Sequence, residues 1–113
     1  MTSKANRRRV ACAALNLLAL ALSGCEAGLP QPNAADAARL DGRFGQTNVP
    51  ELEHGRTLYS SRCGSCHALR EPGSEKPDAW REEVHEMRAK KGVRMSDDEE
   101  RLITAYLISI SSR

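Results

Sequence analysis

The second half of the chain carries apolar residues at helical spacing, and the clearest case lies near the C-terminus. One broad apolar face is formed there by five residues: Leu102, Ile103, Tyr106, Leu107 and Ile110. Ser96 and Glu99 precede this run at the spacing of a capping box, and Glu99 with Glu100 favours the positive end of a helix. The pattern predicts a helix after Ser96 that packs its apolar face against another helix.

A second helix is predicted to begin near Pro50, because proline suits the first turn of a helix. Residues 51–62 continue it, and Gly55, Tyr59 and Cys63 lie four positions apart on one face. This face is expected to pack against the last helix.

A middle helix is predicted after a loop of residues 68–77, which contains two prolines and a glycine. Asp78 is its expected cap, and Gly92 is expected to end it. One face carries Trp80, Val84, Met87 and Lys91, and a charged face carries Arg81, His85 and Arg88. The sequence therefore predicts an all-α domain of three main helices over residues 50–113.

The first 25 residues have the organisation of an export signal. Basic residues precede an apolar run over residues 10–22, which is too short to span a bilayer comfortably. The run ends in Leu-Ser-Gly-Cys at residues 22–25, which resembles the lipobox of bacterial lipoproteins, where the precursor is cut before the cysteine and that residue receives lipid. The resemblance implies a signal peptide over residues 1–24, lipidation of Cys25 and a periplasm-facing protein anchored to a membrane of the bacterial cell envelope. An ordinary secretory signal that ends beside a cysteine is the alternative.

The segment after this signal predicts a flexible tether. Residues 25–49 are rich in Ala, Gly, Pro, Asn, Gln and Asp and carry few large apolar side chains, although residues 34–40 suit a short helix. Fully extended, at roughly 3.3 Å per residue, such a tether would hold a domain tens of ångströms from a membrane.

The charge balance of the 113-residue chain changes once the signal is removed. The whole chain has a net charge of +2, but loss of residues 1–24 lowers Lys and Arg from 17 to 13 against 15 Asp and Glu, which gives −2. The excess of basic residues therefore belongs to the signal, and no nucleic-acid partner is expected.

The candidate chemistry lies in Cys63-Gly64-Ser65-Cys66-His67, because C-x-x-C-H is the spacing at which a c-type haem is attached. Two thiols about one helical turn apart can reach one edge of a single porphyrin. The neutral imidazole of His67 is a good ligand for haem iron. The chain has only four aromatic residues, Phe44, Tyr59, Trp80 and Tyr106, so a buried haem would also supply apolar bulk that so small a core lacks.

Other uses of two nearby cysteines fit less well. A thioredoxin-like site expects a strand before the motif, whereas these flanks predict helix. A zinc site needs four ligands, and only Cys63, Cys66 and His67 cluster in the sequence. A structural disulfide between Cys63 and Cys66 is the main alternative.

Residues 51–112 resemble a class I c-type cytochrome. Besides the haem motif, the resemblance is carried by a glycine, an aromatic residue and a cysteine in the first helix and by a Tyr-Leu pair in the last: Gly55, Tyr59, Cys63, Tyr106 and Leu107. It implies a compact cytochrome c fold around one covalent haem, with the terminal helices crossing closely at Gly55 against Tyr106.

The second axial ligand of the iron is less determined, because the span between the haem motif and the last helix is shorter than the family usually has. Met87 ends a W-x-x-x-V-x-x-M pattern at residues 80–87 that resembles compact bacterial relatives, and it is the first candidate. Met95 is the alternative, and His85, Lys91 or an open position are also considered.

The resemblance implies single-electron transfer between periplasmic or membrane redox partners, without enzymatic activity. A partner is expected to dock transiently at an exposed haem edge near Cys63 and Cys66. The rim of this edge is expected to carry three arginines: Arg62, Arg70 and Arg81. The chain is expected to be a monomer or a subunit of a larger redox complex. The alternative is a haem-based sensor or peroxidase-like enzyme with an open or displaceable sixth ligand, although no distal acid–base pair accompanies His85.

Overall fold

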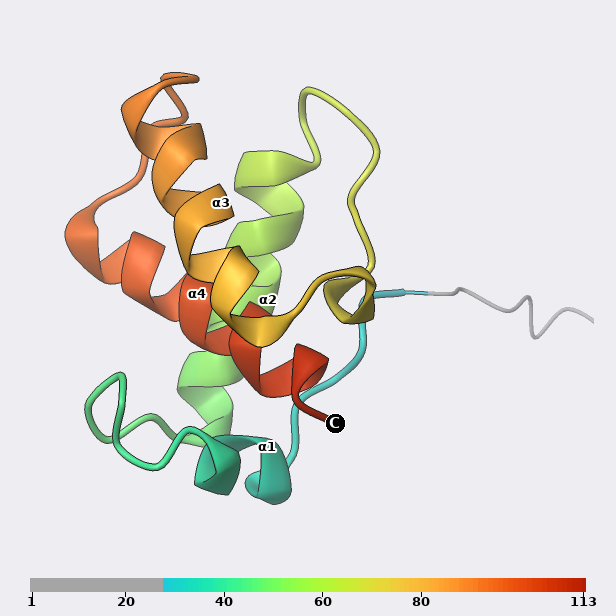
Figure 1. Cartoon of the computed structure of the whole chain (residues 1–113), viewed down its shortest axis with the longest axis vertical. Helices are drawn as coiled ribbons and strands as arrows, with labels where there is room; N and C mark the ends of the chain where they lie inside the picture. The colour runs from blue at the N-terminus through green and yellow to red at the C-terminus, as the bar shows by residue number, and fades with distance from the viewer. Residues whose placement is uncertain (1–27) are drawn as a thin grey trace, which may run out of the picture.

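Helices form the whole framework of residues 28–113, the part of the chain that the computed structural model describes (Figure 1). The elements in chain order are α1 (Ala34–Arg39), α2 (Val49–Cys63), the 3-10 helix η1 (Pro72–Ser74), α3 (Pro77–Ala89) and α4 (Asp97–Ser111). These residues contain no strand, so the predicted all-α class is confirmed for them.

The expected signal peptide of residues 1–24 and the lipidation site Cys25 lie outside the described residues. Within residues 28–113, none of the helices is both long enough and apolar enough to cross a membrane.

Capping boxes mark the first residues of two of the three long helices. At α4, Ser96 and Glu99 form the predicted capping box, and at α2 Asn48 and Glu51 form another. Helix α3 differs from its prediction: it begins at Pro77 after Lys76, and Asp78 lies inside the first turn without capping it. Proline at the first helical position accounts for the earlier start, because the proline ring presets the helical φ angle.

Helix α4 is the centre of the core and contacts both α2 and α3 (Figure 1). Its residues from Leu102 to Ile110 are all buried, and Tyr106 and Leu107 have no exposed surface. An apolar stripe alone would bury one side. Here the remaining sides are covered as well, by α1 and η1.

The predicted crossing of α2 and α4 at Gly55 is confirmed. A side-chain carbon at this position would lie 2.8 Å from the carbonyl carbon of Leu102 and 3.0 Å from Cβ of Tyr106. Both distances are shorter than an ordinary van der Waals contact, so the two helices approach this closely only because residue 55 has no side chain.

The structure corrects the expectation of a flexible tether for residues 28–48. Three consecutive backbone carbonyls near the start of this segment accept hydrogen bonds from side chains of the helical body: Leu29 from Arg56 at 2.9 Å, Pro30 from the Tyr106 hydroxyl at 2.8 Å, and Gln31 from Arg113 at 2.7 Å. The chain is therefore fixed to the body from residue 29 onward.

The short helix expected within residues 34–40 is present as α1, but it packs against α2 and α4 instead of belonging to a tether. Asn33 caps α1 in a capping box with Asp36, and the Asp36 side chain is fully buried. Leu40 and Phe44 are only 1% and 7% exposed and belong to the core. Residues 28–48 thus supply part of the hydrophobic core instead of a spacer.

Candidate functional site

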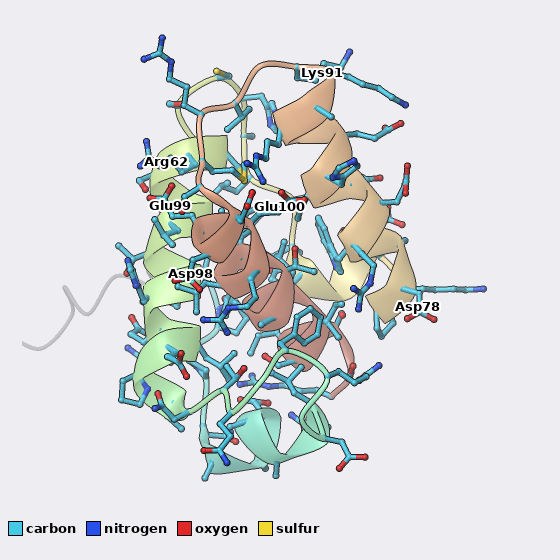
Figure 2. All side chains as sticks on the ribbon, turned by 90° about the vertical axis from the view of Figure 1, so that its left-hand side faces the viewer. Arg62, Asp78, Lys91, Asp98, Glu99 and Glu100 are labelled. Carbon is cyan, nitrogen blue, oxygen red and sulfur yellow. The ribbon has the colours of Figure 1, made fainter. Side chains whose placement is uncertain are left out.

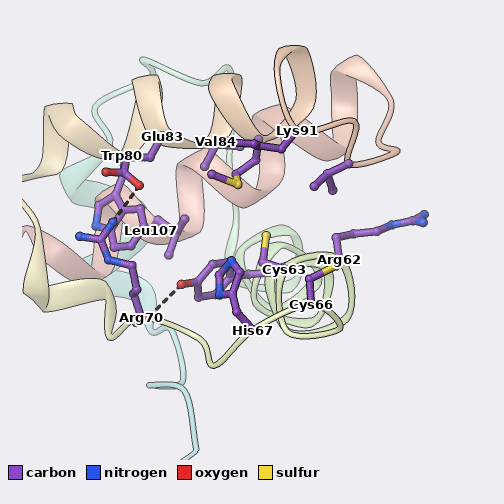
Figure 3. A pocket seen from close by; sticks show the side chains of 13 residues that line it. Arg62, Cys63, Cys66, His67, Arg70, Trp80, Glu83, Val84, Lys91 and Leu107 are labelled. Atoms are coloured by element: carbon purple, nitrogen blue, oxygen red, sulfur yellow. Dashed lines mark hydrogen bonds and ion pairs between the residues drawn. The ribbon is translucent and has the colours of Figure 1, made fainter.

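A cavity of about 410 Å³ lies between the C-terminal end of α2, the loop after it and α3 (Figure 3). This volume is within the range of about 300–1,000 Å³ typical of ligand pockets. The lining is largely apolar and comprises thirteen residues, among which are Tyr59, Cys63, Cys66, His67, Trp80, Val84, Met87, Val93 and Leu107.

One side of the cavity carries the two cysteines and the histidine of the C-x-x-C-H sequence. Cys63 is the last residue of α2 and is half-buried, and Cys66 and His67 follow in the exposed turn. All three line the cavity (Figure 3). Both cysteines are free thiols, so the disulfide alternative is not what this structure contains.

The two thiols differ in their surroundings. Burial raises the pKa of the Cys63 thiol, and the neighbouring Cys66 raises that pKa further. Cys66 is exposed. Cys63 is therefore less accessible to solvent than Cys66, and it lines the largely apolar cavity.

The His67 side chain is arranged as a metal ligand would be. Its Nδ1 lies 2.8 Å from the backbone carbonyl oxygen of Ala68. A carbonyl only accepts, so this contact is a hydrogen bond when Nδ1 carries the proton, and Nε2 is then left with its lone pair. A backbone carbonyl that fixes the tautomer in this way is common for imidazoles that bind metals.

The opposite side of the cavity is formed by α3. The predicted face of Trp80, Val84, Met87 and Lys91 lines the cavity in full. Figure 3 shows Val84 and Lys91 across the cavity from Cys63, Cys66 and His67. Met87 thus shares a cavity with His67, and its thioether comes from the facing wall.

The other candidates for the second axial ligand lie elsewhere, apart from Lys91. Met95 is partly buried against the hydrophobic core and is not among the residues that line the cavity. His85 is exposed on the charged face, where its Nδ1 lies 3.0 Å from a carboxylate oxygen of Glu100. The structure therefore brings Met87 and Lys91 to the cavity and leaves Met95 and His85 outside it.

The loop of residues 64–71 is held at the cavity by residues of α2 and α3. The Tyr59 hydroxyl donates a hydrogen bond to the backbone carbonyl of Arg70 at 2.8 Å, and Trp80 Nε1 donates one to the carbonyl of Pro72 at 2.8 Å. The Arg70 guanidinium binds Glu83 of α3 at 2.8 Å and lies 5.4 Å from the centre of the Trp80 ring.

The structure brings two of the three arginines expected at the rim to the cavity and places the third away from it. Arg62 and Arg70 line the cavity, and Arg62 also binds Glu99 at the start of α4 at 2.9 Å (Figure 2). Arg81 lies 5.1 Å from the Phe44 ring, on the side of α3 that faces away from the cavity. It shares a helical face with His85 and not with Met87, which explains its position.

Glu83 is a cavity residue that the sequence analysis did not identify. It lies three positions after Trp80 and four before Met87, so the same helical spacing that placed those two residues also places Glu83 at the cavity. What the spacing did not reveal is its partner, because Arg70 lies in a loop without a periodic pattern.

The residues around the cavity fit a c-type haem. Two free thiols, an imidazole with one nitrogen available and a thioether surround one largely apolar space, which is the donor set that the group requires. Within residues 28–113, no three His, Cys, Asp or Glu side chains form a cluster that would hold a metal ion by themselves. Comparison with protein-family models, with curated proteins and with solved structures found no match to this chain.

Proposed function

We propose that this chain is a monohaem c-type cytochrome of compact fold that transfers single electrons between redox partners in the bacterial cell envelope. The observation that carries the proposal is that Cys63, Cys66 and His67 line the same largely apolar cavity as Met87, which lies on the facing wall. A haem bound there supplies a one-electron couple between ferric and ferrous iron.

Each residue has a distinct role in this proposal. Cys63 and Cys66 would hold the haem through thioether bonds, and His67 would bind its iron through Nε2. Met87 would supply a second ligand from the facing wall. The apolar side chains of Val84, Val93 and Leu107 exclude water. In such a pocket, one thioether and one imidazole ligand favour ferrous iron more than two imidazole ligands do.

A redox partner docks at the exposed edge of the cavity. Cys66 and His67 are exposed there, and Arg62 contributes a positive charge at the rim. Interfaces between electron carriers are small and transient, so a few charged side chains suffice to orient the partner. Because Arg81 faces away, docking involves the Arg62 side of the cavity and not the charged face of α3.

The proposed lipid anchor at Cys25 places the domain close to a membrane. Arg56 fixes the carbonyl of Leu29 to the body, and four residue steps of at most about 3.6 Å each separate Leu29 from Cys25. The reach of the anchor is therefore at most about 14 Å, in place of the tens of ångströms expected for a tether. Such a carrier serves partners at the membrane surface, either as a monomer or as a subunit of a redox complex.

Absorption spectra of the full chain test the proposal, with the protein produced in a host that attaches haem c. The wild type is expected to show low-spin iron with a sulfur-to-iron charge-transfer band in the ferric state. Met87→Ala is expected to lose this band, and Met95→Ala, which changes a methionine outside the cavity, is expected to keep it.

High-spin iron in the wild type and rapid binding of CO to its ferrous form would contradict an electron carrier. That result would instead support the alternative, a haem-based sensor or peroxidase-like enzyme with an open or displaceable sixth ligand. Loss of the band in Met95→Ala alone would contradict the assignment of Met87.

A further inference from the structure

We propose that Arg70 is a positioning residue that holds the two walls of the cavity at a fixed separation, and so keeps Met87 at the distance from His67 at which both could bind one haem iron. This inference rests on the proposed cytochrome function. One wall is the loop that carries Cys66 and His67, and the other is α3, which carries Met87. Arg70 is the residue of the loop that contacts both α2 and α3.

The wall that carries His67 has little support of its own. No backbone–backbone hydrogen bond joins residues 65–70 to another part of the described chain. Most of these residues are exposed, and only Leu69 is partly buried against the core. The position of this loop therefore depends on side-chain contacts, because no backbone hydrogen bonds of a strand or a helix hold the loop in place.

Arg70 supplies two of these contacts, one through its backbone carbonyl and one through its guanidinium. Its backbone carbonyl accepts the hydrogen bond from Tyr59 of α2, at 2.8 Å, and Tyr59 is only 5% exposed. Its guanidinium binds Glu83 of α3 at 2.8 Å and also pairs with Glu75. The same guanidinium lies over the Trp80 ring, at a distance where a cation and an aromatic face attract each other.

The bridge to Glu83 is the part of this arrangement that spans the cavity. Arg70 and Glu83 both line it, from opposite walls (Figure 3). Without the bridge, the loop that carries His67 would be free to move relative to α3, which carries Met87. His67 and Met87 would then hold a haem iron between them for less of the time, and a small external ligand would bind faster.

The rate of CO binding to the ferrous full chain tests this role, in Arg70→Gln, in Glu83→Gln and in the double variant. Each single variant is expected to bind CO roughly two- to fivefold faster than the wild type, the range in which loss of one exposed ion pair shifts an opening equilibrium. The double variant is expected to match the faster single variant, because the bridge is already absent in each.

This design separates positioning from charge. The two single variants change the charge of the site in opposite directions, so a purely electrostatic effect would move their reduction potentials and rates in opposite directions. Arg81→Gln is the matched control, because it removes a positive charge from α3, the helix that carries Glu83, at a position that faces away from the cavity. It is expected to leave the CO rate unchanged.

Unchanged CO rates in both single variants would overturn the proposal, and so would opposite changes, additive changes in the double variant or an equal increase in Arg81→Gln. All of these outcomes leave the haem attached and the carrier function intact. Failure of the cytochrome proposal itself is distinguishable, since the wild type would then carry no haem, or would carry high-spin iron and bind CO rapidly before any substitution is made.

Discussion

Asp36 is the buried charge of the described residues that most needs an explanation. Its side chain is fully buried, yet it is ionised beside two arginines that bind it, Arg39 and Arg113, and it accepts a backbone hydrogen bond from Asn33. The hydrogen bond from Arg113 is the main cause that holds the pKa of this carboxyl below its ordinary value. Asp36 thus joins α1 to the last residue of the chain.

Asp36→Asn is expected to lower the free energy of unfolding at neutral pH by about 1–3 kcal/mol, because the amide cannot replace a charged acceptor of several hydrogen bonds. Glu82→Gln on the exposed surface of α3 is the control and is expected to change it little. Urea unfolding of the full-length haem protein measures both. An equal loss in the two variants would contradict a specific role for Asp36.

The pH dependence of this effect has a defined sign. A carboxyl whose pKa is lowered by folding stabilises the folded state above its unfolded pKa of about 4 and loses that contribution as the pH falls through the folded pKa. The difference between wild type and Asp36→Asn is therefore expected to be full at neutral pH and to shrink in acid.

At the scale of single residues, local chemistry could be predicted from the sequence and long-range pairing could not. The spacing of Cys63, Cys66 and His67 located the cavity correctly, since these residues are neighbours in the chain. Glu83 and Arg70 are 13 residues apart and no local pattern connects them.

At the scale of elements, the crossing of α2 and α4 determines how the core is built. Gly55 lets the backbones approach, and Leu102 and Tyr106 of α4 occupy the space that a side chain would need. Tyr59 lies one turn further along α2 and reaches the cavity, so the crossing also sets the position of the candidate site.

Gly55→Ala is expected to destabilise the fold by about 1–3 kcal/mol, because the added carbon overlaps the backbone of Leu102 and overpacking exceeds the gain in helix propensity. Gly73→Ala is the matched control, since a side-chain carbon there would have no heavy atom within 4 Å. The midpoint of thermal unfolding compares the two, and a stable Gly55→Ala protein would show that the crossing is looser than described.

The helices themselves were predictable because their signals are local. The capping box of Ser96 and Glu99 and the apolar face of the last helix placed α4 correctly. The start of α3 was predicted two residues too late, because Asp78 is a good capping residue, whereas Pro77 takes the first helical position.

At the scale of the whole molecule, the segment before α2 is what the sequence did not reveal. Its composition is typical of a linker, and it packs because of distant partners: Arg56 lies 27 residues after Leu29, Tyr106 76 after Pro30, and Arg113 82 after Gln31. No window of local sequence contains both members of such a pair. The outcome is a body that includes residues 28–48 and an anchor, if Cys25 is lipidated, of only a few residues.

Covalent haem attachment is the most direct test of the central claim. The full chain, produced in a host that attaches haem c, is expected to gain the mass of one haem, to keep it after denaturation and to show the reduced spectrum of a haem with two thioether bonds. Replacing both Cys63 and Cys66 by Ser is expected to abolish the covalent gain in mass. A wild-type chain that matures without haem, or that releases it on denaturation, would contradict the account.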